Sequence, residues 1–263
     1  MHNETDSSGS MHPEATKRRN KGGRSVRSFV FRRARLNKLH RSAIERLSGQ
    51  YVLELPEPHD HLPEPHEQVE THRPSLFDRF EVECPKKLFE IGFGMGYATA
   101  EFAQAHPEIC VLGSEVYPPG VGKLLSEIEQ RDLKRVRIVR RDAIEVLEGG
   151  IRENEIDAVH VFFPDPWPKR KHHKRRLVQP SFLNLVASRL KPGSYLYVTT
   201  DWDNYAEHIA EVLGSHEMFV NADPAGDDPR KSVPRSWRPR TAFEKKGLSK
   251  GHTVSEFYYQ VSK

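Results

Sequence analysis

The chain has 263 residues, 36% of them hydrophobic, and its 41 Lys and Arg against 37 Asp and Glu give a net charge of +4. This length suits one large domain, or one domain with an extension. No apolar run reaches the roughly 18–20 residues of a membrane span, and the basic N-terminus lacks the apolar core of a secretory signal. Cys84 and Cys110 are the only cysteines, too few for a disulfide framework or a cysteine-based metal site. We therefore expect a soluble, cytoplasmic protein.

The N-terminal part of the chain is predicted to contain a tail and a basic arm. Residues 1–16 show no hydrophobic periodicity and are expected to be disordered. Residues 17–50 form the arm, in which residues 17–46 hold twelve Lys and Arg and a single acid, Glu45. Apolar residues alternate with these cations from residue 24 to 47. The arm therefore forms either a short helix or a segment that orders on a polyanion, although a solvated basic tail fits equally well.

Residues 51–84 are predicted to be an irregular linker rich in Pro, Glu and His. Four prolines between residues 56 and 65 oppose a helix there. His59, Asp60, His61 and His66 lie close together in this segment, but their spacing matches no usual zinc site. We predict no metal site in the chain.

Residues 85–263 show an alternation of strand and helix patterns. Strands are expected at Leu88–Ile91, Ile109–Glu115, Val136–Arg140, Ile156–Phe163 and Ser194–Thr199, with later strands at Glu217–Val220 and Ser255–Val261. Helices are expected at Tyr97–Ala105, Gly120–Gln130, Arg176–Leu190 and Tyr205–Leu213. This alternation predicts an α/β fold with a doubly wound, mostly parallel sheet and helices on both faces.

A carboxylate follows or ends each of the first five predicted strands. These acids are Glu90, Glu115, Asp142, Asp165 and Asp201. Ligands bind outside the carboxyl ends of the strands in open α/β sheets, so five acids along this edge predict one acidic cleft. Any one of them could instead cap a helix, and for Asp142 taken alone that interpretation is favoured.

The turn after the first strand indicates which ligand suits the cleft. It contains three glycines, which permit a tight turn and close backbone approach: Gly92, Gly94 and Gly96. Tyr97 breaks the spacing of a dinucleotide motif, and Glu90 would repel a pyrophosphate. S-adenosylmethionine instead carries a sulfonium and an ammonium group that favour carboxylates. Glu115 could accept from its ribose hydroxyls and Asp142 from its adenine amino group, so the cleft favours this donor over NAD or ATP.

The segment after the fourth strand, residues 162–169, has the sequence Phe-Phe-Pro-Asp-Pro-Trp-Pro-Lys. Prolines on both sides of Asp165 fix the backbone that carries its carboxylate, and Trp167 offers a ring on which a base could stack. Residues 169–176 then hold six Lys and Arg without an acid. A charge run is usually a solvated face, but its position beside a rigid acid at the rim of the cleft favours nucleic-acid binding.

Six motifs resemble the bacterial tRNA (guanine-N7)-methyltransferases, in order and over nearly all of residues 86–263. They are Phe89–Gly96, Gly113–Val121, Asp142–Leu147, Phe163–Arg176, Thr200–His208 and Arg240–Gly247, and residues 24–30 are similar to that family's N-terminal arm. The resemblance implies a Rossmann-like class I methyltransferase domain over residues 85–263, preceded by a basic arm. It implies transfer of a methyl group from S-adenosylmethionine to N7 of a guanosine in the tRNA variable loop. Ser114, Pro119 and Ala242 depart from the family's pattern without removing a charged group.

The resemblance also implies a role for each site residue. The S-adenosylmethionine pocket would be formed by Glu90, Gly92, Gly94, Gly96, Glu115, Asp142 and Asp165, with Asp165 as the catalytic residue. The substrate guanosine would be held by Lys169, Asp201, Thr241, Ala242, Phe243 and Glu244. RNA would be contacted by Lys171, His172, His173, Lys174, Arg175 and Arg176.

Two other functions stay open at this point. The same fold could methylate a different RNA or a small cationic acceptor, but a small acceptor would leave the basic tract without use. A non-catalytic RNA-binding protein would gain nothing from acids beside its RNA. Trp202 and Tyr205 could stack on a base or pack at a helix start. No candidate oligomer interface stands out.

Overall fold

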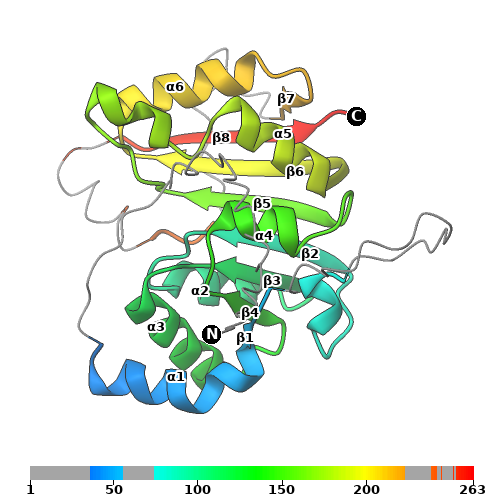
Figure 1. Ribbon diagram of the computed structural model, residues 1–263, viewed down its shortest axis with the longest axis vertical. Coiled ribbons are helices and arrows are strands. Elements are labelled where there is room, and N and C mark those ends of the chain that lie inside the picture. Colours follow the sequence, from blue (N-terminus) through cyan, green and yellow to red (C-terminus); the bar gives the residue numbers. More distant parts are fainter. Residues whose placement is uncertain (1–35, 56–73, 223–237, 242–243, 245–250, 252) are drawn as a thin grey trace, which may run out of the picture.

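The computed structural model describes residues 36–55, 74–222, 238–241, 244, 251 and 253–263 (Figure 1). Within these residues one sheet has the strand order β1-β4-β3-β2-β5-β6-β8-β7. The strands are β1 (Val52–Leu53), β2 (Lys86–Ile91), β3 (Ile109–Ser114), β4 (Val136–Val139), β5 (Ile156–Phe162), β6 (Leu190–Thr200), β7 (Phe219–Asn221) and β8 (Ser255–Val261). All neighbouring pairs from β1 to β6 are parallel, whereas β8 runs antiparallel to both β6 and β7. The predicted mostly parallel α/β sheet is confirmed.

Local sequence explains where the helices begin. They are α1 (Lys38–Tyr51), α2 (Tyr97–Ala105), α3 (Pro118–Arg131), α4 (Ala143–Gly149), α5 (Pro180–Arg189) and α6 (Asp203–Gly214), with 3₁₀ turns η1 (Leu76–Arg79) and η2 (Arg170–Arg175). Asn37 caps α1 by accepting a hydrogen bond from the His40 amide at 2.7 Å. Pro118 and Pro180 open α3 and α5, at positions where a helix needs no N–H donor.

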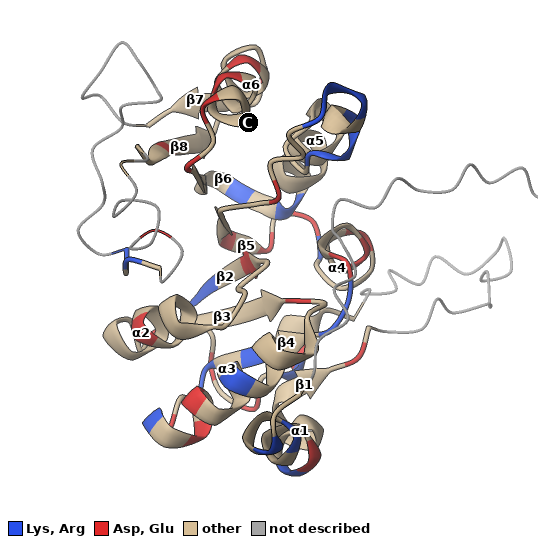
Figure 2. Ribbon diagram, turned by 90° about the vertical axis from the view of Figure 1, so that its left-hand side faces the viewer, with Lys and Arg blue, Asp and Glu red and all other residues tan. Residues whose placement is uncertain are grey.

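Helices cover both faces of the sheet. Successive residues of β2, Leu88 and Phe89, point to opposite faces and belong to two separate apolar clusters. The cluster around Leu88 includes residues of α1, α2 and α3. The cluster around Phe89 includes η1, α4, α5 and α6. Figure 2 shows α2 and α3 on one side of the sheet and α4 and α5 on the other.

The winding of the chain reverses between β2 and β5. From β2 the chain proceeds outward to β3 and β4, then returns to β5 beside β2 and continues to β6. In Figure 1 the arrowheads of β5 and β6 point to the same edge of the sheet, and that of β8 points the opposite way. The switch point that forms ligand sites in doubly wound folds therefore lies between the carboxyl ends of β2 and β5.

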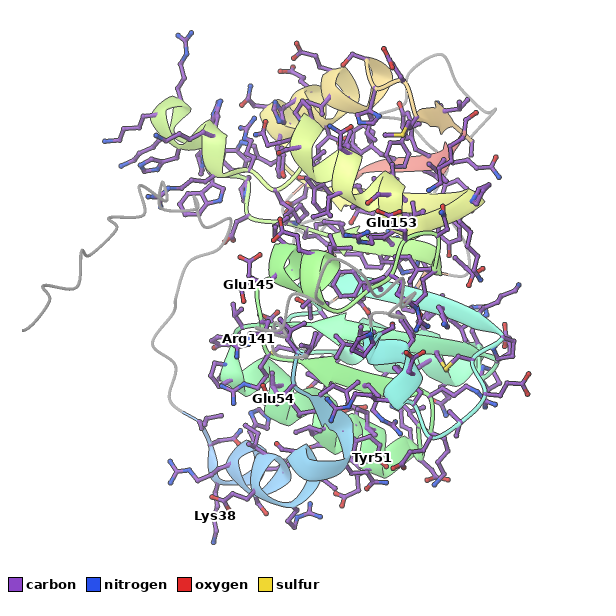
Figure 3. All side chains as sticks on the ribbon, turned by 45° about the vertical axis from the view of Figure 1, so that its right-hand side comes forward. Lys38, Tyr51, Glu54, Arg141, Glu145 and Glu153 are labelled. Carbon is purple, nitrogen blue, oxygen red and sulfur yellow. A yellow bond between two sulfur atoms is a disulfide. The ribbon has the colours of Figure 1, made fainter. Side chains whose placement is uncertain are left out.

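Part of the predicted basic arm is built into the domain. Helix α1, whose two ends are marked by Lys38 and Tyr51 in Figure 3, packs on α3. A Cβ on Gly122 would lie 2.7 Å from the His40 Cβ, so the absence of a side chain there permits this close approach. Arg46 also donates two hydrogen bonds to Glu129, at 2.6 and 2.9 Å. The tail and the rest of the arm, residues 1–35, lie outside the described residues.

The predicted linker over residues 51–84 is wrong at both of its ends. Strand β1 pairs with β4 at the edge of the sheet. Leu76 and Phe77 of η1 are buried, and the Leu76 amide donates to the Gly150 carbonyl at 2.8 Å. The middle of this segment is rich in Pro and acids, and its composition led the whole segment to be predicted as a linker, although short apolar stretches lie at both ends. The four candidate metal ligands between residues 59 and 66 lie outside the described residues.

A disulfide joins Cys84, just before β2, to Cys110 in β3, with a Cα–Cα distance of 5.4 Å. In the parallel register of β2 and β3 the residue opposite Cys110 is Lys87, so the disulfide joins the segment just before β2 to β3 and is not a cross-strand pair. In the described part of the chain, no helix has the length and apolar character needed to cross a membrane.

Candidate active site

Three of the five predicted acids come together at the switch point. Glu90 lies in β2, Glu115 follows β3 and Asp165 follows β5. The charge of Glu115 helps to raise the pKa of Glu90, and the charge of Asp165 helps to raise the pKa of Glu115, after the larger effect of burial in each case. These mutual effects place the three carboxyl groups within electrostatic reach of one another at the carboxyl ends of β2, β3 and β5.

The Glu115 carboxylate is held by backbone amides. It accepts hydrogen bonds from the amides of Gly94 at 2.8 Å, Val116 at 2.7 Å and Tyr117 at 2.9 Å. Burial raises the pKa of Glu115, and these three amides oppose that effect because they favour the charged form. Glu115 thus ties the glycine turn after β2 to the end of β3.

The glycine turn requires its glycines. Gly92, Gly94 and Gly96 have φ values of 72°, 58° and 74°, in the left-handed region that L side chains rarely adopt. Gly120, in the first turn of α3, presses against this turn, and a Cβ there would lie 1.9 Å from the Gly94 carbonyl oxygen. Sequence reasoning missed Gly120, because nothing in its spacing marks a contact with a turn some 26 residues earlier.

Asp142 has the structural role that the sequence left open. Its side chain accepts a hydrogen bond from the Ile144 amide at 2.8 Å and caps α4, a helix that the sequence analysis did not predict.

Tyr205 is buried, and its hydroxyl accepts from the Val178 amide at 3.1 Å, so it packs rather than stacks on a ligand. Trp202 remains 40% exposed, directly after the half-buried Asp201.

The loop that carries Asp165 is strained on both sides. Phe163 has a φ of 53° and Trp167 a φ of 45°, both unusual for residues with aromatic side chains. Conformations of this kind cost about 1–3 kcal/mol each and persist only where surrounding contacts enforce them. One such contact is the hydrogen bond from the Phe163 amide to the Thr199 carbonyl, at 2.9 Å. The Asp165 backbone is therefore fixed by more than its two prolines.

The predicted RNA contact of Arg176, the last cation of the basic tract, differs from its position in the structure. Arg176 was expected to contact RNA, but it is only 2% exposed. Its Nε donates to the Pro166 carbonyl at 3.0 Å, and its guanidinium also donates to the Asn204 side chain at 2.7 Å. Arg176 clamps the Asp165 loop onto the start of α6 and is not available to a phosphate in this structure.

The remaining cations of the tract project from η2, none of whose residues is buried. Figure 2 shows this turn as a mostly blue, basic stretch beside α5. The Arg175 guanidinium lies 4.9 Å from the centre of the Trp167 ring, and the His172 ring meets Trp167 edge-on at 5.8 Å. Desolvation, followed by the neighbouring cations, lowers the pKa of His172. Its imidazole therefore favours the neutral form beside Lys171 and Arg175.

The predicted guanosine-binding residues lie in different environments. Lys169 is exposed where η2 begins, and Ala242 and Phe243 lie outside the described residues. The Thr241 hydroxyl accepts from the Glu244 amide at 3.0 Å. Glu244 is 4% exposed and forms a bidentate ion pair with Arg238, at 2.7 and 2.8 Å. The prediction that Glu244 holds the guanosine is not met in this structure, because its carboxylate is buried and paired.

Comparison with known proteins identifies the family. A protein-family model described as "Putative methyltransferase" matches residues 85–257. The tRNA (guanine-N(7)-)-methyltransferase of Nitrosospira multiformis is 43% identical over 237 residues, which cover 90% of this chain and 95% of that protein. The protein of the same name from Paraburkholderia xenovorans is 44% identical over 237 residues, covering 90% and 84%. The chain belongs to the tRNA (guanine-N(7)-)-methyltransferase family.

Membership of this family makes the chain an S-adenosylmethionine-dependent methyltransferase. Among solved structures, the 16S rRNA methyltransferase KamB aligns with a TM-score of 0.49 at 13% identity, covering 71% of this chain and 93% of that one.

The acids of this methyltransferase fit a cationic donor. Glu90 is 5% exposed, and burial raises its pKa to about 7; the nearby Thr99 side chain opposes the shift and the charge of Glu115 adds to it. A buried carboxylate next to a second acid is costly to ionise. A sulfonium or ammonium group in the cleft would compensate this charge, so the residues present fit S-adenosylmethionine.

Replacing Glu90 by glutamine is expected to stabilise the ligand-free methyltransferase at pH 8 and to weaken donor binding. The unfolded chain ionises Glu90 near pH 4.5 and the folded chain near pH 7. Wild-type stability therefore falls as the pH rises from 4.5 through 7, and this loss is complete above that range. Removing the charge restores up to roughly 3 kcal/mol.

Thermal unfolding of both proteins without donor, from pH 5 to pH 8, measures this effect. The stability difference should grow with pH and shrink towards pH 5. A difference that is independent of pH would contradict the assignment of a buried, reluctantly ionised Glu90.

Proposed function

We propose that this methyltransferase transfers the methyl group of S-adenosylmethionine to N7 of a guanosine in the variable loop of tRNA, in the cytoplasm. The names of its relatives support tRNA and guanine N7 as the substrate and target atom. The observation that carries the proposal is the continuity of one segment of chain. The Asp165 loop belongs to the acidic cleft at one end and leads directly into the exposed basic turn η2 at the other.

Guanine N7 has an in-plane lone pair and no proton, so its methylation requires no strong base. S-adenosylmethionine, when bound, supplies an electrophilic methyl group on a sulfonium centre. Glu90 would accept from or pair with the cationic part of the donor, and Glu115 would accept from its ribose hydroxyls. Asp142 would face the adenine amino group with the part of its carboxylate not used in capping α4.

Asp165 would orient the guanine and stabilise the transition state. A carboxylate can accept hydrogen bonds from the guanine N1–H and 2-amino groups. Its negative charge also favours the positive charge that develops on the purine as the methyl group arrives. Asp201, at the end of the neighbouring strand β6, and Lys169, at the start of η2, would complete the guanosine site from two sides.

The exposed cations of η2 would bind tRNA phosphates. Changing Lys171 and Lys174 together to alanine is expected to weaken tRNA binding and to lower its salt dependence by about one unit of slope per lost phosphate contact. Binding of the donor should be unchanged. A matched control changes two exposed lysines at the amino ends of the strands to alanine: Lys86, which begins β2, and Lys134, which precedes β4.

Titration of tRNA at several salt concentrations separates the two variants. Equal losses in both would mean that net charge alone attracts the RNA, and would contradict a defined interface on η2.

Methyl transfer from S-adenosylmethionine to an unmodified tRNA transcript, followed by nucleoside mass spectrometry, tests the proposed function. We expect 7-methylguanosine, located in the variable loop by nuclease mapping. Another methylated nucleoside, or transfer only to a different RNA, would overturn the proposed substrate while leaving the family membership intact.

A further inference from the structure

A buried ion-pair network joins the segment around Thr241 to the sheet. The Arg238 guanidinium donates to both carboxylate oxygens of Glu244, at 2.7 and 2.8 Å, and to Glu256 at 2.6 Å. Its Nε donates to the Tyr197 hydroxyl at 3.0 Å, and Tyr197 in turn donates to Glu256. All four side chains are buried. One guanidinium therefore pairs with two buried carboxylates, one from the segment around Thr241 and one from β8.

Arg238 is placed where the predicted guanosine-binding elements meet. Tyr197 lies in β6, the strand that ends just before Asp201. The Arg238 guanidinium also lies 5.7 Å from the ring centre of Phe162, the last residue of β5, whose loop carries Asp165. The same side chain thus contacts β6, the end of β5 and the segment that contains Thr241.

The two described polar residues of the Thr-Ala-Phe-Glu segment are engaged within the protein. A threonine followed three residues later by glutamate is the sequence of a capping box, in which the threonine hydroxyl accepts from the later amide. Thr241 and Glu244 make that contact at 3.0 Å. The Glu244 carboxylate, however, pairs with Arg238 instead of returning to the cap.

We propose that Arg238 is a positioning residue for methyl transfer, and that Glu244 acts through Arg238 rather than by contacting the guanosine. This inference rests on the proposed function. The pair fixes residues 239–241 and Glu244 against β6 and the end of β5, so that Thr241 lies on the side of the guanosine that Asp165 and Asp201 would contact. Burial by itself lowers the pKa of Arg238, but its ion pairs outweigh burial and raise the pKa, so the guanidinium stays charged.

A double-mutant cycle on the full-length protein tests the inference. Arg238→Gln and Glu244→Gln are each expected to lower kcat/KM for tRNA by on the order of 10- to 100-fold, because misplacement by about 1 Å can cost that much. If Glu244 acts through Arg238, the double variant loses no more than the worse single variant. Arg238→Lys, which keeps the charge but not the bidentate geometry, should recover part of the activity and serves in the cycle if Arg238→Gln does not fold.

Binding of S-adenosylhomocysteine, measured by calorimetry, separates positioning from general damage. We expect its affinity to change by less than about threefold in all variants, since neither residue belongs to the donor cleft. Losses in kcat/KM that multiply in the double variant would show that Glu244 contacts the guanosine itself and would overturn the inference. A parallel loss of donor affinity would assign the network to overall folding and would also overturn it.

Asp78→Asn provides the matched control. It disrupts another bidentate pair, with Arg152 at 2.6 and 2.7 Å. Arg152 precedes β5, so this pair lies at the amino ends of the strands, away from Asp165. The kcat/KM of Asp78→Asn should equal that of wild type even if its melting temperature falls. The wild-type enzyme also distinguishes the two failures: absence of 7-methylguanosine refutes the proposed function, whereas an additive cycle with 7-methylguanosine present refutes this inference alone.

Discussion

Asp165→Asn is expected to lower kcat for methyl transfer to tRNA by about 10²–10³-fold, the usual effect of removing one preorganised electrostatic contact to a transition state. The change keeps the size of the side chain but removes its charge. The loop should keep its conformation, because Phe163 is tied to β6 and Arg176 holds the Pro166 carbonyl. Affinities for tRNA and S-adenosylhomocysteine should therefore remain close to those of wild type.

Single-turnover methylation with saturating donor and tRNA measures this effect directly. Glu153→Gln is the matched control, because this carboxylate, labelled in Figure 3, is exposed and precedes β5, at the end of the strand away from Asp165. Near-normal turnover in Asp165→Asn would show that its charge has no part in the chemical step. A large loss of tRNA affinity with normal kcat would reassign Asp165 to substrate binding.

Gly120→Ala is expected to weaken donor binding by on the order of 10–100-fold, corresponding to the 1–3 kcal/mol that overpacking usually costs. The new methyl group would lie 1.9 Å from the Gly94 carbonyl oxygen and 3.0 Å from its carbonyl carbon. Backbone, not a flexible side chain, must then move. The displaced turn would also release the Gly94 amide from Glu115.

Calorimetric titration with S-adenosylhomocysteine tests this expectation. Gly49→Ala in α1 is the control, because a Cβ there meets no atom within 4 Å; this change should stabilise the helix by about 0.5–1 kcal/mol and leave donor affinity unaltered. Unchanged donor affinity in Gly120→Ala would mean that the glycine turn does not shape the donor site.

Much of the fold is contained in short stretches of sequence. The predicted bounds of the helix at Tyr97–Ala105 and the strand at Ser255–Val261 agree with the structure. Both elements have hydrophobic patterns and boundary residues that act over a few positions, so local sequence is sufficient to define them. The gathering of acids at one end of the sheet could also be predicted, because parallel strands bring their carboxyl ends to one edge whatever their order in the sheet.

The environment of each charged residue could not be predicted in this way. Lys174, Arg175 and Arg176 are consecutive cations, but the first two are exposed and Arg176 is buried against Pro166 and Asn204. The same holds for Glu244, whose partner Arg238 is itself paired with β8.

The sequence by itself therefore determined the α/β alternation, the acids at the strand ends and the basic segment after Asp165. Only the tertiary structure decided that Gly120 supports the glycine turn, that Arg176 clamps the Asp165 loop and that Glu244 pairs with Arg238. The reason is physical: strand and helix patterns depend on neighbours a few residues away, whereas burial and ion pairing depend on which distant segments the fold brings into contact.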